Sequence, residues 1–163
     1  MYILNLGCGA DYRESNDETR WLNVDISPNI RTDQIVDGFK VPYPFEDQQF
    51  DGVLAQDFLE HVPHTIFDKD FRPIPVDGFI LVLDEIWRIL KPNGILEARC
   101  PSPNVYFNCF ADPTHQRVVF PQSFEWYFTT KGPFSFYTNL HWEYVGFTDT
   151  PEGNLIHQLR KPG

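Results

Sequence analysis

Short apolar runs separated by polar turns fill the first sixty residues and return after residue 94. Runs of this length, rich in Leu, Ile and Val, are typical of buried strands. They predict strands over Tyr2–Leu6, Trp21–Ile26, Asp33–Val36, Phe50–Ala55 and Ile95–Arg99. Apolar residues at intervals of three and four predict a helix over Gly78–Leu90, capped by Asp77 and ended by Pro92-Asn93-Gly94. This order predicts an α/β fold: a doubly wound, mostly parallel sheet with helices on its faces, in a single domain over residues 1–163.

The other segments predict connections and a different C-terminal part. Val41–Phe45 holds two prolines and cannot be helical, whereas Asp57–Val62 predicts a helical turn. The following stretch, with Pro63, Pro73 and Pro75, predicts a loop that serves as a lid or an insertion. The last third predicts a short helix followed by a C-terminal antiparallel hairpin: Pro121–Phe128, then His141–Thr148 paired with Asn154–Leu159.

Charge and composition narrow the class of protein. The formal net charge is −10, and the first sixty residues hold twelve acidic residues against four basic ones. An acidic surface repels phosphate backbones, so nucleic acid is disfavoured as a partner and a cationic ligand is favoured. No apolar run approaches the roughly 20 residues of a membrane span, and no signal-peptide pattern is present, so we expect a cytoplasmic protein without a membrane partner. Cys8, Cys100 and Cys109 lack Cys-x-x-Cys spacing, and we interpret them as reduced thiols.

A glycine pair and a carboxylate follow the first two predicted strands. Gly7 and Gly9 lie where backbone can approach a ligand without a Cβ in the way, although a simple tight turn explains a lone Gly-x-Gly equally well. Asp25 ends the second strand, where a carboxylate can accept hydrogen bonds from both hydroxyls of a ribose. A nicotinamide site requires a third glycine, and that position is Tyr12. The pattern therefore favours an adenosine that carries a positive sulfonium.

Five motifs occur along the chain in an order that is typical of one protein family. These are Leu4–Gly9, Leu22–Ser27, Pro42–Asp51, Asp57–His61 and Glu85–Gly94. They resemble the motif set of class I S-adenosylmethionine-dependent methyltransferases, most closely the small-molecule group, from residue 3 to about residue 104. Asp112-Pro113-Thr114-His115 also resembles a segment of some members.

The resemblance implies a cofactor site for S-adenosylmethionine. The loop Gly7 to Gly9 would face the methionine part, Asp25 would hold the ribose and Ile26 would flank the adenine. Asp37 matches the position that reads the adenine edge, and Gln56 lies near the sulfonium. The expected cofactor-binding residues are Leu6, Gly7, Cys8, Gly9, Asp25, Ile26, Asp37 and Gln56.

Methyl transfer depends mainly on positioning and water exclusion, although an acceptor that loses a proton benefits from a base. Asp57, His61 and His115 are the candidate catalytic residues. Each also has a structural interpretation: a helix N-cap for Asp57, packing beside the sheet for His61, and loop anchoring for His115. His61 and His64, with Asp57, Glu60 and Asp68 nearby, could form a metal site, but Pro63 interrupts that turn, solvated charge explains the acids, and we expect no metal.

The acceptor is predicted by elimination. DNA amino-group methylation uses an Asn/Asp-Pro-Pro-aromatic motif, and the corresponding site is Ala55-Gln56-Asp57-Phe58, so a small-molecule acceptor with an oxygen or nitrogen nucleophile is expected. Members of the family usually carry helices before the first strand and a long first crossover, both of which are shortened here. We therefore expect an open cofactor site that a homo-oligomer could cover. A non-catalytic cofactor-binding or assembly module is the alternative function.

Overall fold

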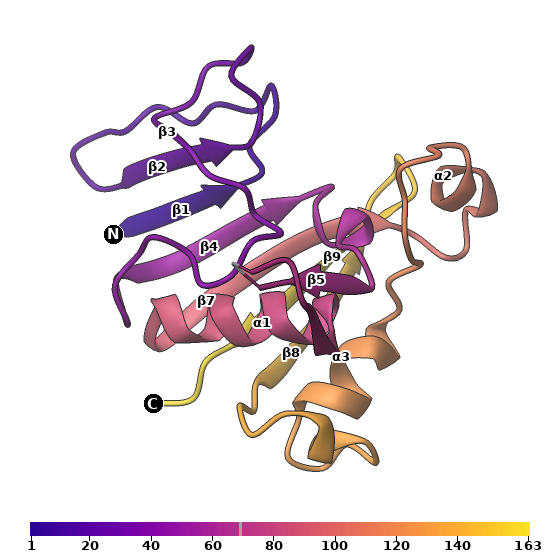
Figure 1. The fold of residues 1–163 in the computed structure, drawn as a ribbon. Coiled ribbons are helices and arrows are strands. Elements are labelled where there is room, and N and C mark those ends of the chain that lie inside the picture. Colours follow the sequence, from indigo (N-terminus) through magenta and orange to yellow (C-terminus); the bar gives the residue numbers. More distant parts are fainter. Residues whose placement is uncertain (69) are drawn as a thin grey trace.

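Seven strands form one sheet in the computed structural model, which describes residues 1–68 and 70–163 (Figure 1). Their order across the sheet is β3-β2-β1-β4-β7-β9-β8. The bounds are β1 Tyr2–Leu6, β2 Arg20–Asp25, β3 Gln34–Ile35, β4 Phe50–Gln56, β7 Leu90–Pro101, β8 Glu143–Asp149 and β9 Asn154–Arg160. β9 is antiparallel to both of its neighbours, and the pairs among β1, β2, β3, β4 and β7 are all parallel. The predicted α/β class, with its mostly parallel sheet and C-terminal antiparallel hairpin, is confirmed.

Helix α1 (Gly78–Ile89) forms where the apolar stripe predicts it. The carboxylate of Asp77 accepts a hydrogen bond from the backbone N–H of Phe79 at 2.8 Å, which confirms the predicted N-cap. The helix ends one residue early because Leu90 already has an extended backbone and begins β7. The register then shifts, since Phe50 pairs with Leu90 but Gly52 pairs with Ile95.

Two predictions for the connections need correction. The stretch predicted as a loop after Val62 contains a two-stranded antiparallel sheet, β5 (Thr65–Phe67) with β6 (Pro73–Asp77). Its strands are short and proline-rich, so the sequence pattern resembles a loop. A short helix, α2 (Tyr106–Phe110), was not predicted. The helix α3 (Pro121–Phe128) matches its predicted bounds, and 3₁₀ turns occupy η1 (Leu59–His61) and η2 (Ser135–Tyr137).

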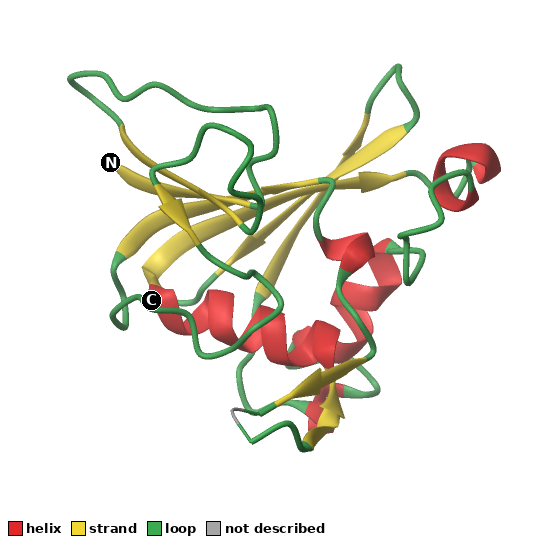
Figure 2. Cartoon of the chain, turned by 45° about the horizontal axis from the view of Figure 1, so that its top comes forward, coloured by secondary structure: helices red, strands yellow, loops and turns green. Residues whose placement is uncertain are grey.

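The main core lies between one face of the sheet and α1. Figure 2 shows the long helix on one side of the sheet and loops on the other. Phe79 of α1 packs against Phe124 and Phe128 of α3, with ring centroids 5.8 and 5.9 Å apart, so both helices share this side. Leu4 and Leu96 from the sheet are fully buried in the same cluster. Burial of these side chains, at about 25 cal/mol per Å² of apolar surface, is the main stabilising contribution.

No helix covers the opposite face within the described part of the chain, so side-chain hydrogen bonds hold the first crossover there. Asn23, 1% exposed, accepts a hydrogen bond from the backbone N–H of Arg13 at 2.8 Å and donates to its carbonyl at 3.0 Å. It also donates to Asp33 at 2.9 Å and accepts from Asn5 at 3.1 Å. Asn5 in turn donates to the carbonyl of Asp11 at 2.7 Å. Buried amides thus position the segment that follows the glycine loop.

Replacing Asn23 with alanine should therefore lower the free energy of unfolding by about 1 to 3 kcal/mol, because it leaves several buried polar groups unpaired. Urea unfolding followed by circular dichroism measures the change. Asn29→Ala, at an exposed position of the next loop, is the matched control and should stay within about 0.5 kcal/mol of the parent. Equal effects of the two substitutions would contradict the role assigned to Asn23.

A membrane crossing needs a long apolar helix, and no helix of the described residues has the necessary length and apolar character.

Candidate functional site

The carboxyl ends of β1, β2 and β4 meet around one cavity of about 480 Å³. Parallel strands place the residues that follow them at one edge of the sheet, which is the usual position of a ligand in this kind of fold. The cavity is lined by Gly7, Asp25, Ile26, Val36, Asp37, Gly38, Phe39, Asp57, Phe58, His61, Pro63, Thr114 and Gln116.

The glycine loop comes close to an aromatic ring. Gly7 has a φ of +66°, and a Cβ built on it would lie 2.6 Å from Cδ2 of Phe58. A Cβ on Gly38 would lie 2.7 Å from the same ring. Phe58 also stacks on Phe39, with centroids 5.2 Å apart. The two glycines are therefore required for close packing around Phe58, which forms one wall of the cavity.

Asp25 is held by backbone donors from both sides. Its Oδ2 accepts a hydrogen bond from the N–H of Gly9 at 3.0 Å, and its Oδ1 accepts one from the N–H of Ser27 at 2.9 Å. Each carboxylate oxygen has further lone pairs, so the group can still accept hydrogen bonds from a ligand in the cavity. The carboxylate thus links the loop after β1 to the loop after β2.

Asp57 directly follows β4 and has a left-handed conformation, with a φ of +49°. Such a backbone is uncommon for a residue other than glycine and occurs frequently at functional sites. Its carboxylate forms a close ion pair with Arg99 of β7, and this pairing raises the pKa of the guanidinium. Because Arg99 already occupies the carboxylate, Asp57 is less suited to act as a base than its position alone indicates.

Glu60, His61 and His115 come together beside the cavity. Glu60 is 1% exposed, and burial, followed by the nearby charge of Asp57, raises its pKa to about 7. The rings of His61 and His115 have centroids 4.7 Å apart. His61 lines the cavity, whereas His115 does not. Among the residues that the structure describes, these three form a group of side chains that could hold a metal ion.

The predicted site residues divide into two groups. Gly7, Asp25, Ile26, Asp37, Asp57 and His61 line the cavity. The others surround it without lining it: Leu6, Cys8, Gly9, Gln56 and His115. Leu6 and Cys8 are buried, and Gly9 acts through its hydrogen bond to Asp25.

Sequence reasoning missed part of the lining. Gly38 directly follows Asp37, and a glycine next to a predicted ligand contact was a signal available in the sequence. Thr114 lies in the Asp112–His115 segment, whose position against the cavity comes only from the fold. Arg99 does not line the cavity, but its ion pair with Asp57 was also missed, because nothing along the chain links the two residues.

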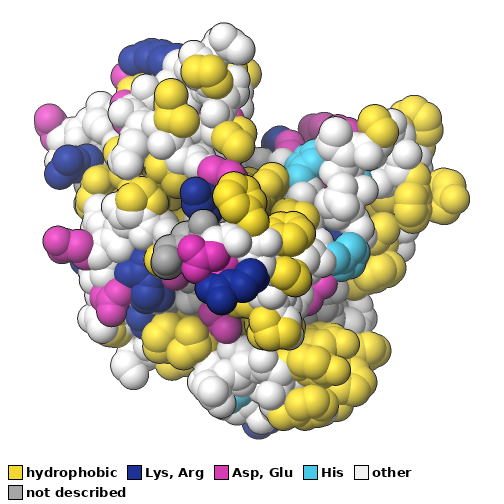
Figure 3. All heavy atoms as spheres, in the orientation of Figure 1, with side chains coloured by type: hydrophobic (Ala, Val, Ile, Leu, Met, Phe, Trp, Pro, Cys, Tyr) yellow, Lys and Arg dark blue, Asp and Glu magenta, His cyan; other side chains and the backbone are white. Residues whose placement is uncertain are grey.

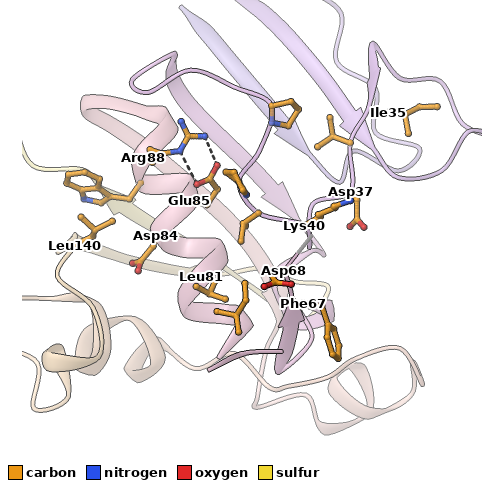
Figure 4. A pocket seen from close by; sticks show the side chains of 16 residues that line it. Ile35, Asp37, Lys40, Phe67, Asp68, Leu81, Asp84, Glu85, Arg88 and Leu140 are labelled. Carbon is orange, nitrogen blue, oxygen red and sulfur yellow. Dashed lines mark hydrogen bonds and ion pairs between the residues drawn. The ribbon is translucent and has the colours of Figure 1, made fainter. Parts of the chain in front are cut away.

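A larger cavity, of about 910 Å³, lies between α1 and the segment after β3 (Figure 4). Arg88 and Glu85, a charged pair that lines this cavity, already make hydrogen bonds to each other and to the neighbouring segment. Arg88 donates to Glu85 at 2.5 Å and to Asp47 at 2.6 Å, and Glu85 accepts a hydrogen bond from the N–H of Tyr43 at 2.6 Å. These contacts fasten the 43–47 segment to the helix. We therefore assign the pair a structural role.

Comparison with known proteins agrees with this geometry. Residues 4–98 match the methyltransferase domain family, and the chain belongs to that family. Among curated proteins, none matches the sequence. A SAM-dependent methyltransferase from Archaeoglobus fulgidus has the same fold, with a TM-score of 0.63 and 14% identity over 98% of this chain and 86% of that one.

Two further solved structures share the fold. A putative methyltransferase in complex with the Trm112 methyltransferase activator of Haloferax volcanii gives a TM-score of 0.64 and 16% identity, over 99% of this chain and 82% of that one. The 1,6-didemethyltoxoflavin-N1-methyltransferase of Burkholderia thailandensis, with bound 1,6-didemethyltoxoflavin and S-adenosylhomocysteine, gives 0.60 and 15%, over 99% and 71%. The family and these neighbours confirm the predicted resemblance and support S-adenosylmethionine as the cofactor.

Proposed function

We propose that this chain, as one domain over residues 1–163, transfers the methyl group of S-adenosylmethionine to an oxygen or nitrogen of a small molecule. The observation that carries the proposal is the cavity shared by Gly7, Asp25 and Asp57 at three neighbouring strand ends. Its volume of about 480 Å³ is in the range of small-molecule sites. Bound there, the cofactor supplies a methyl carbon that is activated by a positively charged sulfur.

The residues of the cavity fit the parts of this cofactor. We assign Asp25 the hydrogen bonds with the ribose hydroxyls and the loop Gly7–Gly9 the methionine part, since Gly7 lines the cavity and the space beside Gly9 is open. Ile26 and Phe39 offer apolar surface for the adenine, next to Asp37. The three aspartates that line the cavity favour a cationic ligand over an anionic one.

The candidate catalytic residues have different access to an acceptor. His61 lines the cavity and is assigned contact with the acceptor. His115 acts behind it, through its ring contact with His61. Asp57 is paired with Arg99, and we assign it the orientation of the strand end rather than proton removal. The protein's contribution is then mainly alignment of the acceptor with the methyl carbon and exclusion of water.

The test is calorimetry followed by turnover. We expect S-adenosylmethionine and S-adenosylhomocysteine to bind with one site per chain, and a panel of phenols, diols, sugars and amines to include an acceptor that increases S-adenosylhomocysteine formation. The parent protein without acceptor gives the background rate, and Asp25→Ala is the matched negative control. Failure to bind either compound would overturn the proposal.

A second candidate function is a non-catalytic cofactor-binding or assembly module. It is favoured by two groups of exposed aromatic side chains, which Figure 3 shows as hydrophobic surface near α2 and near α3 and η2. Tyr106 and Phe107 are 75% and 76% exposed, and Phe136 and Tyr137 are 76% and 55% exposed. Exposed apolar patches frequently mark interfaces. Cofactor binding without turnover on any acceptor, together with light scattering that shows a homo-oligomer, would favour this candidate.

A further inference from the structure

The loop that carries His115 is fastened to the turn that carries Glu60 and His61. The backbone N–H of Gln116 donates to the carbonyl of Glu60 at 2.8 Å, and the guanidinium of Arg117 donates to the carbonyl of Val62 at 2.9 Å. As a result, a carboxylate oxygen of Glu60 and one ring nitrogen of each histidine all lie within 4.8 Å of one another. Three chemically suitable ligand atoms are thus gathered from two distant segments.

The hydrogen bonds of both histidines engage Nδ1 of each ring, and within the described chain Nε2 of neither ring makes a hydrogen bond. Nδ1 of His115 lies 2.9 Å from the carbonyl of Cys109 and must donate to it. The hydroxyl of Thr114 donates to Asp112 at 2.6 Å, so its oxygen accepts from Nδ1 of His61 at 3.0 Å. With Nδ1 engaged in each ring, Nε2 is the nitrogen that can offer a lone pair to a metal ion, and Nε2 of His115 also lies 4.0 Å from the carboxylate of Asp112. Metal-binding histidines are commonly fixed in this way by a donated hydrogen bond from the other nitrogen.

The carboxylate of Glu60 independently indicates a bound cation. The residue is 1% exposed, both carboxylate oxygens are buried, and within the described chain neither oxygen has a hydrogen-bond partner. The thiol of Cys100, at most a weak donor, lies beside it. A buried carboxylate without a partner is costly, and a bound cation would satisfy it.

We propose that Glu60, His61 and His115 bind one divalent transition-metal ion. Two imidazoles and one carboxylate suit Zn²⁺, Co²⁺, Mn²⁺ or Fe²⁺, whereas Ca²⁺ and Mg²⁺ prefer oxygen ligands alone. Three protein ligands leave coordination positions open, and His61 places the ion at the wall of the cavity. An oxygen of the acceptor can then occupy an open position. This last consequence rests on the proposed function, but the binding of the ion does not.

The site differs from both expectations drawn from the sequence, which were no metal or a His61–His64 pair. His64 is directed elsewhere, because its Nδ1 lies 2.9 Å from Asp77 and its Nε2 lies 3.2 Å from the carbonyl of Gln116. Both of its nitrogens therefore have partners outside the cluster. The structure replaces His64 with His115, which follows His61 by more than fifty residues.

Metal binding is measured on the full chain after removal of bound metal with a chelator. Calorimetry with Zn²⁺ and visible absorption with Co²⁺ should show one ion per chain. Glu60→Gln and His115→Asn should each weaken binding by at least about tenfold, because loss of even a residue that only supports a metal ligand costs about 10- to 100-fold. His64→Asn is the matched control, from the same segment, and should leave the affinity unchanged.

Several results would overturn the proposal. These are no saturable uptake of either ion by the parent, equal affinity in the parent and both cluster variants, or a loss of affinity in His64→Asn alone. Circular dichroism identifies any variant that does not fold, in which case the other variant decides. Neither titration contains S-adenosylmethionine or an acceptor, so a failure here is distinguishable from a failure of the methyltransferase assignment.

Discussion

Alanine in place of Asp25 is expected to raise the dissociation constant for S-adenosylmethionine about 30- to 150-fold, which corresponds to about 2 to 3 kcal/mol. The carboxylate is expected to accept hydrogen bonds from the ribose hydroxyls. A hydrogen bond to an ionised group is about twice as strong as one between two neutral groups. It also holds the N–H groups of Gly9 and Ser27, at 3.0 and 2.9 Å. Its loss therefore removes ligand contacts and loosens the glycine loop.

Calorimetry with S-adenosylmethionine and with S-adenosylhomocysteine measures this effect. Both compounds carry the same ribose, so the two dissociation constants should rise by similar factors. Asp17→Ala removes an equal charge from an exposed position of the same half of the chain and should change neither constant appreciably. An unchanged affinity in the Asp25 variant would remove this residue from the cofactor site.

Acidification is expected to destabilise the protein through His157 of β9. This side chain is fully buried, and burial lowers its pKa to about 4 from an ordinary value of 6.5. Its Nδ1 lies 3.1 Å from the hydroxyl of Tyr144, its ring centroid lies 4.8 Å from that of Phe124, and its Nε2 has no partner within the described chain. The folded state therefore excludes the proton that the unfolded state binds below pH 6.5.

The direction in which stability changes with pH follows from this difference in pKa. Between the two pKa values the unfolded state binds more protons, so the free energy of unfolding decreases as the pH is lowered. The expected contribution of His157 is a loss of about 1 kcal/mol between about pH 7 and pH 5.5, and of about 3 kcal/mol by about pH 4. Burying the charge, rather than losing a specific contact, is the cause.

Comparing the parent with His157→Leu by urea unfolding at about pH 7 and about pH 5.5 isolates this contribution. Glu60, whose pKa burial raises to about 7, also titrates in this interval, but it contributes equally to both proteins. His157→Leu should lose some stability at neutral pH, since Tyr144 loses a partner, but its change in stability between the two pH values should lack the loss of about 1 kcal/mol expected from His157. A variant that keeps the full pH dependence would show that another group is responsible.

The local pattern of the chain was enough to predict the strands and the main helix. Tyr2–Leu6 and Gly78–Ile89 follow directly from apolar runs and from spacing of three and four, since each element must bury one side. Gly7, Asp25 and Asp57 were predictable for a related reason. Residues that end parallel strands meet at one edge, so their position along the chain already indicates their position in space.

Other features depend on contacts between segments that no local pattern links. Phe58 packs against both Gly7 and Gly38, and Arg99 pairs with Asp57, only because the sheet brings these strands together. The sequence also predicted helices on both faces of the sheet. Instead, the buried amide of Asn23 holds the short first crossover against the second face, which a propensity argument does not reveal.

The sequence by itself therefore determined the class of fold and which residues end the parallel strands, because these depend on the periodicity of burial and on the direction of parallel strands. Only the tertiary structure decided that His115 joins Glu60 and His61, and that Glu60 is buried without a partner. The physical reason is that loop 112–117 reaches them through long-range hydrogen bonds, such as the one from Gln116 to the carbonyl of Glu60.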